Sequence, residues 1–192
     1  MSETLRVLGM AGSLRRGSYN AAALRACRDL SPHGLSIDIF EGLGDLPHYD
    51  DDLRAAGFPP AVEDLRRRIR AADALLIATP EYNHSVPGVL KNALDWASRP
   101  PEAPVMRKPA AFLGASTGML GSVRAQAHLR DIFVFFDAPV VNKPEVFIGA
   151  AASKFAVDGT LTDEPTRAIL AALLDALRDR ALGARARALA EV

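Results

Sequence analysis

Residues 12–20, Gly-Ser-Leu-Arg-Arg-Gly-Ser-Tyr-Asn, gather polar groups of the kind that bind an anion. They supply two hydroxyls, an amide and a guanidinium, and a segment rich in alanine and leucine follows them. If that segment is a helix, its free N–H groups and its dipole also favour negative charge at this point. We call this segment the 12–20 loop, and it predicts a phosphate site. The candidate ligands are Ser13, Arg15, Ser18 and Asn20.

The 12–20 loop matches neither of two common phosphate-binding motifs. Gly12 and Gly17 have the separation of a P-loop, but Ser18-Tyr19 stand where that motif requires Lys and Ser or Thr. The loop also lacks the Gly-x-Gly that lets a pyrophosphate approach the backbone, so a monophosphate fits better. An alternative of equal weight is that Ser18 or Asn20 only caps the helix.

Residues 79–88, Thr-Pro-Glu-Tyr-Asn-His-Ser-Val-Pro-Gly, form a second polar segment, the 79–88 loop. Its two prolines restrain the backbone, and a helix with one apolar face follows it. An aromatic edge and backbone amides in so stiff a loop suit a flat heteroaromatic ring. Glu81 and Asn83 either contact that ring or maintain the shape of the loop.

Residues 114–121, Gly-Ala-Ser-Thr-Gly-Met-Leu-Gly, form a third segment, the 114–121 loop, ahead of another helix. Small residues let the backbone approach a ligand, and N–H groups there stabilise negative charge on it. The loop also matches the Gly-x-Ser-x-Gly elbow of the α/β-hydrolases. That interpretation fails because the only histidine after Ser116 is His128, and no acidic residue lies between them.

Apolar runs alternate with helical patterns along the chain, and this alternation positions the three loops. It favours a parallel sheet covered by helices on both faces, at whose strand ends ligands bind. The loops after the first, third and fourth strands should therefore meet. The expected strands are 5–10, 35–40, 74–79, 110–115 and, interrupted by Pro144, 140–148. The expected helices are 20–30, 60–72, 88–98, 122–136 and 164–182, and residues 41–59 are expected to be irregular.

These elements predict an α/β fold, a flavodoxin-like three-layer sandwich with a five-stranded parallel sheet, in a single domain spanning residues 1–192. The 23 basic and 23 acidic side chains balance, which argues against a nucleic-acid partner. No apolar run approaches the roughly 18 residues of a membrane span, and no signal peptide is visible, so we expect a cytoplasmic protein. The four histidines and Cys27 show no close pairing, so no metal site is expected.

Several conspicuous residues are most simply structural. Lys91 and Asp95 are four apart and predict an exposed ion pair, whereas Trp96 and Cys27 are expected in the core. The acidic run at 50–52 is interpreted as a solvated turn in preference to a functional loop or an interface.

The segment 122–136 is apolar on more than one side of its predicted helix. One face, with the spacing of a buried helix side, consists of Leu129, Ile132, Phe133 and Phe136. Val134 and Phe135 lie outside that face, so we expect a second copy of the chain to cover them. A fully covered core helix is the alternative.

Three stretches of the chain resemble one protein family when they are taken together. They are Gly-Ser-Leu-Arg-x-x-Ser-x-Asn at 12–20, Pro-Glu-Tyr-Asn-x-Ser-x-Pro-Gly-x-Leu-Lys-Asn-Ala-Leu-Asp-Trp at 80–96, and Gly-x-x-Arg-x-Gln-x-x-Leu-Arg at 121–130. The family is that of the NADPH-dependent FMN reductases, and the closest likeness is to its quinone and chromate reductases. The resemblance implies a flavodoxin fold, bound FMN, NADPH or NADH as co-substrate, a small-molecule acceptor, and a homodimer or homotetramer.

The resemblance assigns three groups of residues to FMN. The phosphate is expected to contact Ser13, Arg15, Ser18 and Asn20. The isoalloxazine ring is expected to contact Pro80, Glu81, Tyr82 and Asn83. Its other edge is expected to contact Ser116, Thr117 and Gly118. The chain departs from its relatives at Gly121-Ser122 and at His128, which bears on the acceptor and on assembly.

The implied reaction is a two-electron, ping-pong transfer from NAD(P)H to the flavin and on to the acceptor, in which no side chain is a catalytic nucleophile. Arg124 either attracts an anionic acceptor or nicotinamide phosphate, or forms a surface or interface ion pair. The alternative function is an FMN-carrying electron-transfer module of the flavodoxin type. Such carriers are generally strongly acidic, and the net charge of zero favours the enzyme.

Overall fold

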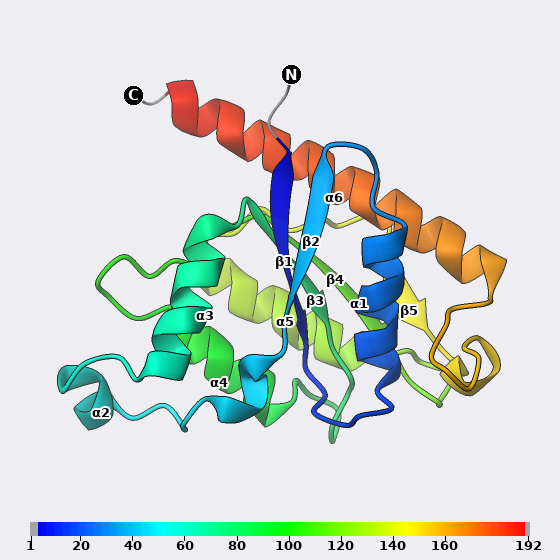
Figure 1. Cartoon of the computed structure of the whole chain (residues 1–192), viewed down its shortest axis with the longest axis horizontal. Coiled ribbons are helices and arrows are strands. Elements are labelled where there is room, and N and C mark those ends of the chain that lie inside the picture. Colours follow the sequence, from blue (N-terminus) through cyan, green and yellow to red (C-terminus); the bar gives the residue numbers. More distant parts are fainter. Residues whose placement is uncertain (1–3, 191–192) are drawn as a thin grey trace.

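The computed structural model describes residues 4–190 and contains a five-stranded sheet whose neighbouring strands are all parallel (Figure 1). The strand order is β2-β1-β3-β4-β5, which is the flavodoxin-like order. The strands are β1 (Leu5–Ala11), β2 (Leu35–Phe40), β3 (Ala74–Ala78), β4 (Ala110–Ala115) and β5 (Val146–Ile148). The predicted fold class is confirmed.

Helices cover both faces of the sheet and complete the three layers (Figure 1). One face carries α1 (Tyr19–Asp29) and α6 (Glu164–Ala190), and the other carries α3 (Pro60–Ala71), α4 (Gly88–Ala97) and α5 (Val123–Phe135). Successive strand residues alternate between the two cores, so Leu76 packs towards α1 and α6 while Leu75 and Ile77 pack towards the other helices. All of β3 is buried, as expected of a central strand covered on both sides.

Three segments differ from the expected bounds. The predicted strand 140–148 shortens to β5, and Val140 forms only an isolated bridge with Ala110. Pro144, which lies between Val140 and β5, interrupts the strand because it has no N–H to donate to a sheet. The predicted irregular segment 41–59 contains a 3-10 helix, η1 (Gly42–Asp45), and a short helix, α2 (Asp51–Ala55). Helix α6 also continues beyond residue 182.

The acidic run at 50–52 begins α2. The Asp50 carboxylate accepts a hydrogen bond from the backbone N–H of Asp52 at 2.9 Å, and Asp51 and Asp52 occupy the first helical turn. Acidic groups there complement the positive end of the helix dipole. The run is solvated, as predicted, but it starts a helix where a turn was expected.

The conspicuous structural residues lie as predicted. Trp96 is fully buried, and its Nε1 donates to the carbonyl of Pro47 at 2.9 Å. Burial raises the pKa of the Cys27 thiol to about 12, so the thiol stays protonated at neutral pH and serves only to pack the core. The Lys91 ammonium contacts the Asp95 carboxylate at 2.7 Å on the outer side of α4.

The two edges of the sheet carry different structures. The 12–20, 79–88 and 114–121 loops follow β1, β3 and β4 at the carboxyl edge. At the opposite edge, the C-terminal half of α6 passes the start of β1 (Figure 1). Within residues 4–190, no helix is both long and apolar enough to cross a membrane.

Candidate functional site

The three loops enclose a pocket of about 410 Å³ at the carboxyl edge of the sheet. All the residues predicted to contact FMN line it except Asn83 and Gly118. Its lining consists of Ser13, Arg15, Ser18, Tyr19, Asn20, Pro80, Glu81, Tyr82, Ala115, Ser116 and Thr117. This confirms the expectation that the loops after the first, third and fourth strands meet.

Two polar residues of the 12–20 loop form bonds within the protein. The Ser18 hydroxyl accepts a hydrogen bond from the N–H of Ala21 at 3.3 Å and so caps α1. The Asn20 amide donates to the carbonyl of Ala115 and accepts from its N–H, both at 2.9 Å. Both side chains are almost fully buried. The capping alternative therefore holds for the side chain of Ser18, whereas the side chain of Asn20 bonds to β4 and does not cap α1.

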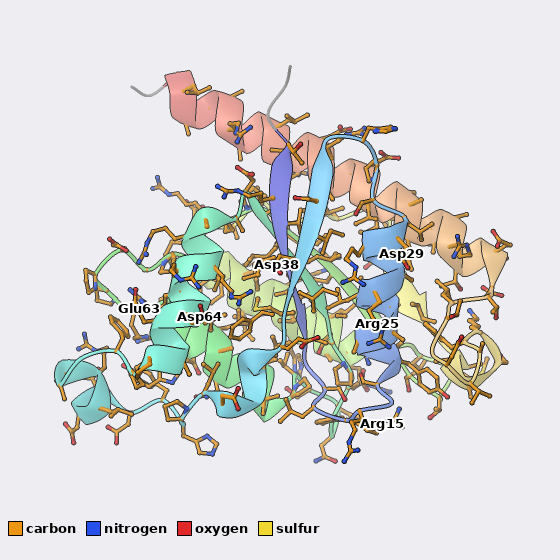
Figure 2. All side chains as sticks on the ribbon, in the orientation of Figure 1. Arg15, Arg25, Asp29, Asp38, Glu63 and Asp64 are labelled. Atoms are coloured by element: carbon orange, nitrogen blue, oxygen red, sulfur yellow. The ribbon has the colours of Figure 1, made fainter. Side chains whose placement is uncertain are left out.

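The rest of the 12–20 loop keeps its donors available. Arg15 projects from the loop at the carboxyl end of β1 (Figure 2), and no carboxylate within residues 4–190 pairs with it. Its guanidinium instead lies 5.6 Å from the centre of the Tyr19 ring. In the described chain, the N–H groups of Tyr19 and Asn20 at the start of α1 also lack an acceptor. A cation and two N–H groups thus stand ready for an anion.

The 79–88 loop contains a tight turn at residues 82–85, whose first residue, Tyr82, lines the pocket. Tyr82 and Ser85 exchange backbone hydrogen bonds of 3.1 and 3.0 Å, and the two residues between them, Asn83 and His84, have φ values of 50° and 66°. Left-handed conformation at both central positions defines a type I′ turn, which asparagine tolerates well. Asn83 is exposed and occupies the first central position of this turn, and the choice between its two expected roles stays open. Tyr82 is half exposed, and its hydroxyl lies 3.4 Å from that of Ser13.

Glu81 joins the 79–88 loop to the start of α5. Its carboxylate accepts from the N–H of Arg124 at 2.9 Å and of Ala125 at 3.3 Å, and it forms a 3.1 Å ion pair with the Arg124 guanidinium. Ser122 precedes the helix at φ 71° and gives it no side-chain cap, so a carboxylate from another loop supplies the cap. Partial burial acts to raise the pKa of Glu81, but the bonds from Arg124 and Ala125 outweigh it and lower the pKa below its ordinary value.

The 114–121 loop also uses its polar groups internally. The Ser116 hydroxyl accepts from the N–H of Gly118 at 3.0 Å, and the carbonyl of Gly118 accepts from Ala150 at 2.9 Å. A Cβ at Gly114 would overlap the Ser122 hydroxyl and lie 2.6 Å from the carbonyl of Thr79. Only glycine therefore fits at 114, where this loop, β3 and α5 meet.

Two features of the site were not predicted. Tyr19 lines the pocket, and the centre of its ring lies 5.4 Å from that of Phe155. Its position between Ser18 and Asn20, both chosen as candidate ligands, was a signal that could have identified it. The bond between Glu81 and α5 had no local signal, because the partners are 43 positions apart. It shows that Arg124 is an ion-pair partner of the site, one of the two roles considered for it.

The pocket offers binding groups and little acid–base chemistry. Its carboxylate, Glu81, is already neutralised by Arg124. Among residues 4–190, no group of three or more His, Cys, Asp and Glu side chains is arranged to hold a metal ion. The arrangement suits a ligand with an anionic end at Arg15 and a flat part near Tyr82, Ser116 and Thr117.

Comparison with known proteins identifies relatives of the whole chain. The model of the NADPH-dependent FMN reductase family matches residues 5–153. The chain is 54% identical over 178 residues to an NAD(P)H-dependent FMN reductase of Pseudomonas aeruginosa, covering 93% of this chain and 96% of that protein. It is 46% identical over 139 residues to a quinone reductase of Escherichia coli K12, covering 72% of this chain and 74% of that protein.

A solved structure gives the same result. The flavoenzyme NAD(P)H:(acceptor) oxidoreductase from Paracoccus denitrificans superposes with a TM-score of 0.85 at 39% identity, covering 94% of this chain and 98% of that one. The sequence match and the superposition each extend well beyond the three loops. This chain belongs to the NADPH-dependent FMN reductase family.

Proposed function

We propose that the protein is an FMN-dependent NAD(P)H oxidoreductase that reduces a small acceptor such as a quinone. The observation that carries the proposal is the pocket at the carboxyl edge, where a guanidinium and two N–H groups without a hydrogen-bond acceptor among residues 4–190 face the same space. The names of the relatives, FMN reductase and quinone reductase, support the choice of cofactor and acceptor.

The donor set of the pocket fits FMN. Arg15, the Ser13 hydroxyl and the N–H groups that begin α1 would hold the phosphate, because they combine positive charge with hydrogen-bond donors. Pro80, Tyr82 and the 114–121 loop would border the ring system. When bound, FMN accepts a hydride from a nicotinamide and supplies two electrons to an acceptor.

The side chains around the pocket have supporting roles in this function. Glu81 holds the 79–88 loop against α5, and Asn20 holds α1 against β4. Both therefore fix the relative positions of the loops that border the ligand. Because the one carboxylate of the pocket is bonded to Arg124, we assign the protein the tasks of binding, orienting and shielding the cofactor.

The test is the colour of the purified protein and its response to nicotinamide. We expect FMN to copurify and its absorbance to be bleached rapidly by NADPH or NADH in an anaerobic stopped-flow experiment, then restored by benzoquinone. Bleaching only by a partner protein would favour the electron-transfer module. A chain that remains colourless with added FMN would contradict both functions. Chromate in place of benzoquinone tests the second acceptor implied by the resemblance.

We further propose a cytoplasmic homodimer or homotetramer that uses α5. Val134 is 78% exposed and Phe135 is 69% exposed, so α5 is not the fully covered core helix of the alternative interpretation. Exposed neighbouring apolar groups of this size favour association. We expect sedimentation at micromolar concentration to give at least a dimer, and a monomer for Phe135→Lys. A wild-type monomer would contradict this assembly.

A further inference from the structure

A second cavity, of about 1040 Å³, lies at the amino edge of the sheet, opposite the FMN pocket. It opens between the end of α5, the segment 137–142 and the C-terminal half of α6. The bridge between Ala110 and Val140 places it beside the start of β4. None of its lining residues belongs to the three loops of the FMN pocket, so the proposed function does not account for it.

The cavity is positively charged in a protein with no net charge. Four guanidiniums line it, from Arg107, Arg130, Arg180 and Arg187, and Asp137 is the one carboxylate among its described lining residues. Arg107 contacts Asp137 at 3.3 Å, but both side chains are more than three-quarters exposed, and such a pair contributes little.

The other three arginines differ in what holds them. Arg130 donates to the amide oxygen of Asn142 at 3.0 Å and to the carbonyl of Val141 at 3.3 Å, which fixes its direction without neutralising its charge. Arg180 and Arg187 have no ion-pair or hydrogen-bond partner within residues 4–190. Guanidiniums that face one space without counter-charges repel one another, and an anion between them removes that repulsion.

The path of α6 explains how these arginines come together. The helix is buried against the sheet as far as Ala181, and the described residues after it are not buried. Arg180 and Arg187 are two turns apart on the same side of the helix, and the small residue Ala184 lies between them. The negative end of the helix dipole stabilises a cation in the last turns, which accounts for Arg187. It does not account for Arg180, which lies too far from that end.

We propose that this cavity binds a nucleotide-sized organic anion with at least two phosphate groups. One guanidinium donates two parallel hydrogen bonds to two oxygens of a phosphate group. Arg180 and Arg187 can bind phosphate groups in this way. Pro139 and Val140 give the cavity an apolar side for a flat ring. The volume is at the upper end of the range of small-molecule sites.

The experiment measures calorimetric binding of ADP and of inorganic pyrophosphate to the FMN-loaded protein. The test variant is Arg180→Gln/Arg187→Gln, because glutamine keeps the helix and removes both charges. The control variant is Arg25→Gln/Arg28→Gln, which removes two exposed charges from α1, where Figure 2 shows Arg25 far from α6's C-terminal end. Both variants must keep the melting temperature and FMN content of the wild type to be compared.

We expect saturable binding of both probes, weakened at least about tenfold by Arg180→Gln/Arg187→Gln and less than about twofold by the control. Binding should also weaken as salt is added. No saturable binding at millimolar probe concentration would overturn the proposal. So would equal weakening by the two double variants, since binding would then not depend on Arg180 and Arg187.

Discussion

The 12–20 loop and the pair formed by the 79–88 and 114–121 loops border the same pocket but use their polar groups differently. In the described chain, the Arg15 guanidinium has no carboxylate partner, and the first N–H groups of α1 have no acceptor. In the other two loops, Glu81 binds α5 and Ser116 binds Gly118. Residue type alone does not separate the groups that we propose to bind FMN from the supports. What separates them is whether the chain already supplies a partner.

The same difference between bonded supports and available donors occurs within the 12–20 loop. Asn20 is buried and bonded twice to Ala115, whereas Arg15, five positions earlier, is exposed and forms no ion pair with any described residue. A change at a support should lower stability, and a change at a free donor should lower affinity for FMN. Each prediction below tests one side of that difference.

The largest expected effect is that of Asn20→Ala on stability. It leaves the buried N–H and C=O of Ala115 without partners, each at a cost of about 1–3 kcal/mol, partly offset by the better helix propensity of alanine. We expect the free energy of unfolding to fall by about 2–4 kcal/mol in urea titrations of the FMN-free protein. Asn142→Ala, at an exposed amide bonded to the Arg130 side chain, is the control and should change it by about 0.5 kcal/mol or less. Equal losses for the two variants would mean that Asn20 is not a support.

Arg15→Ala is the complementary change and should act on affinity. A charge-assisted hydrogen bond contributes about 1.5–3 kcal/mol, so the Kd for FMN should rise by roughly ten- to 150-fold while the urea midpoint of the FMN-free protein stays unchanged. Fluorescence titration with FMN measures the change. Arg16→Ala is the matched control, because Arg16 is exposed in the same loop but does not line the pocket. If the two variants bind FMN equally well, the phosphate does not lie at Arg15.

The fold could be predicted because each strand and helix has a local pattern. The apolar runs become β1, β3 and β4, and the loops follow at the carboxyl edge. The errors fall where local patterns are weak: α2 is five residues long and polar, and Pro144 shortens the last strand. The end of α6 was missed because Gly183 interrupts an otherwise helical pattern.

The sequence predicted most of the residues that line the pocket, but not the bonds that their side chains form. Loop composition identified most of the pocket lining, but it could not show that Asn20 reaches Ala115 or that Glu81 reaches Arg124. Those bonds depend on the packing of strands and helices far apart in the sequence. The arginine cavity at the other edge is invisible for the same reason, since Arg107 and Arg187 meet only through the course of α6.

Glu81→Gln should have a smaller effect that depends on pH. The pKa of Glu81 is lowered from its ordinary value of 4.5, so its ionised form stabilises the fold above that pH, and the contribution is lost as the pH falls through the lower folded value. We expect the variant to be about 1 kcal/mol less stable at pH 7, because glutamine keeps the shape but weakens the cap of α5. Melting temperatures of both proteins from pH 7 to pH 3 should converge towards the acid end. A difference that is constant with pH would exclude the carboxylate as its source.

The smallest expected effect belongs to the ion pair of Lys91 and Asp95, which sharpens the comparison with Glu81 and Arg124. Both pairs join a lysine or arginine to a carboxylate, but Lys91 and Asp95 lie on one helix, and the Lys91 side chain is 46% exposed. Solvent screens such a pair, so Lys91→Met should change the free energy of unfolding by about 0.5 kcal/mol or less. Glu81 differs because its carboxylate is 14% exposed and also accepts two backbone N–H groups. If Lys91→Met were as destabilising as Glu81→Gln, then charge pairing alone, and not the capping of α5, would explain the effect of Glu81.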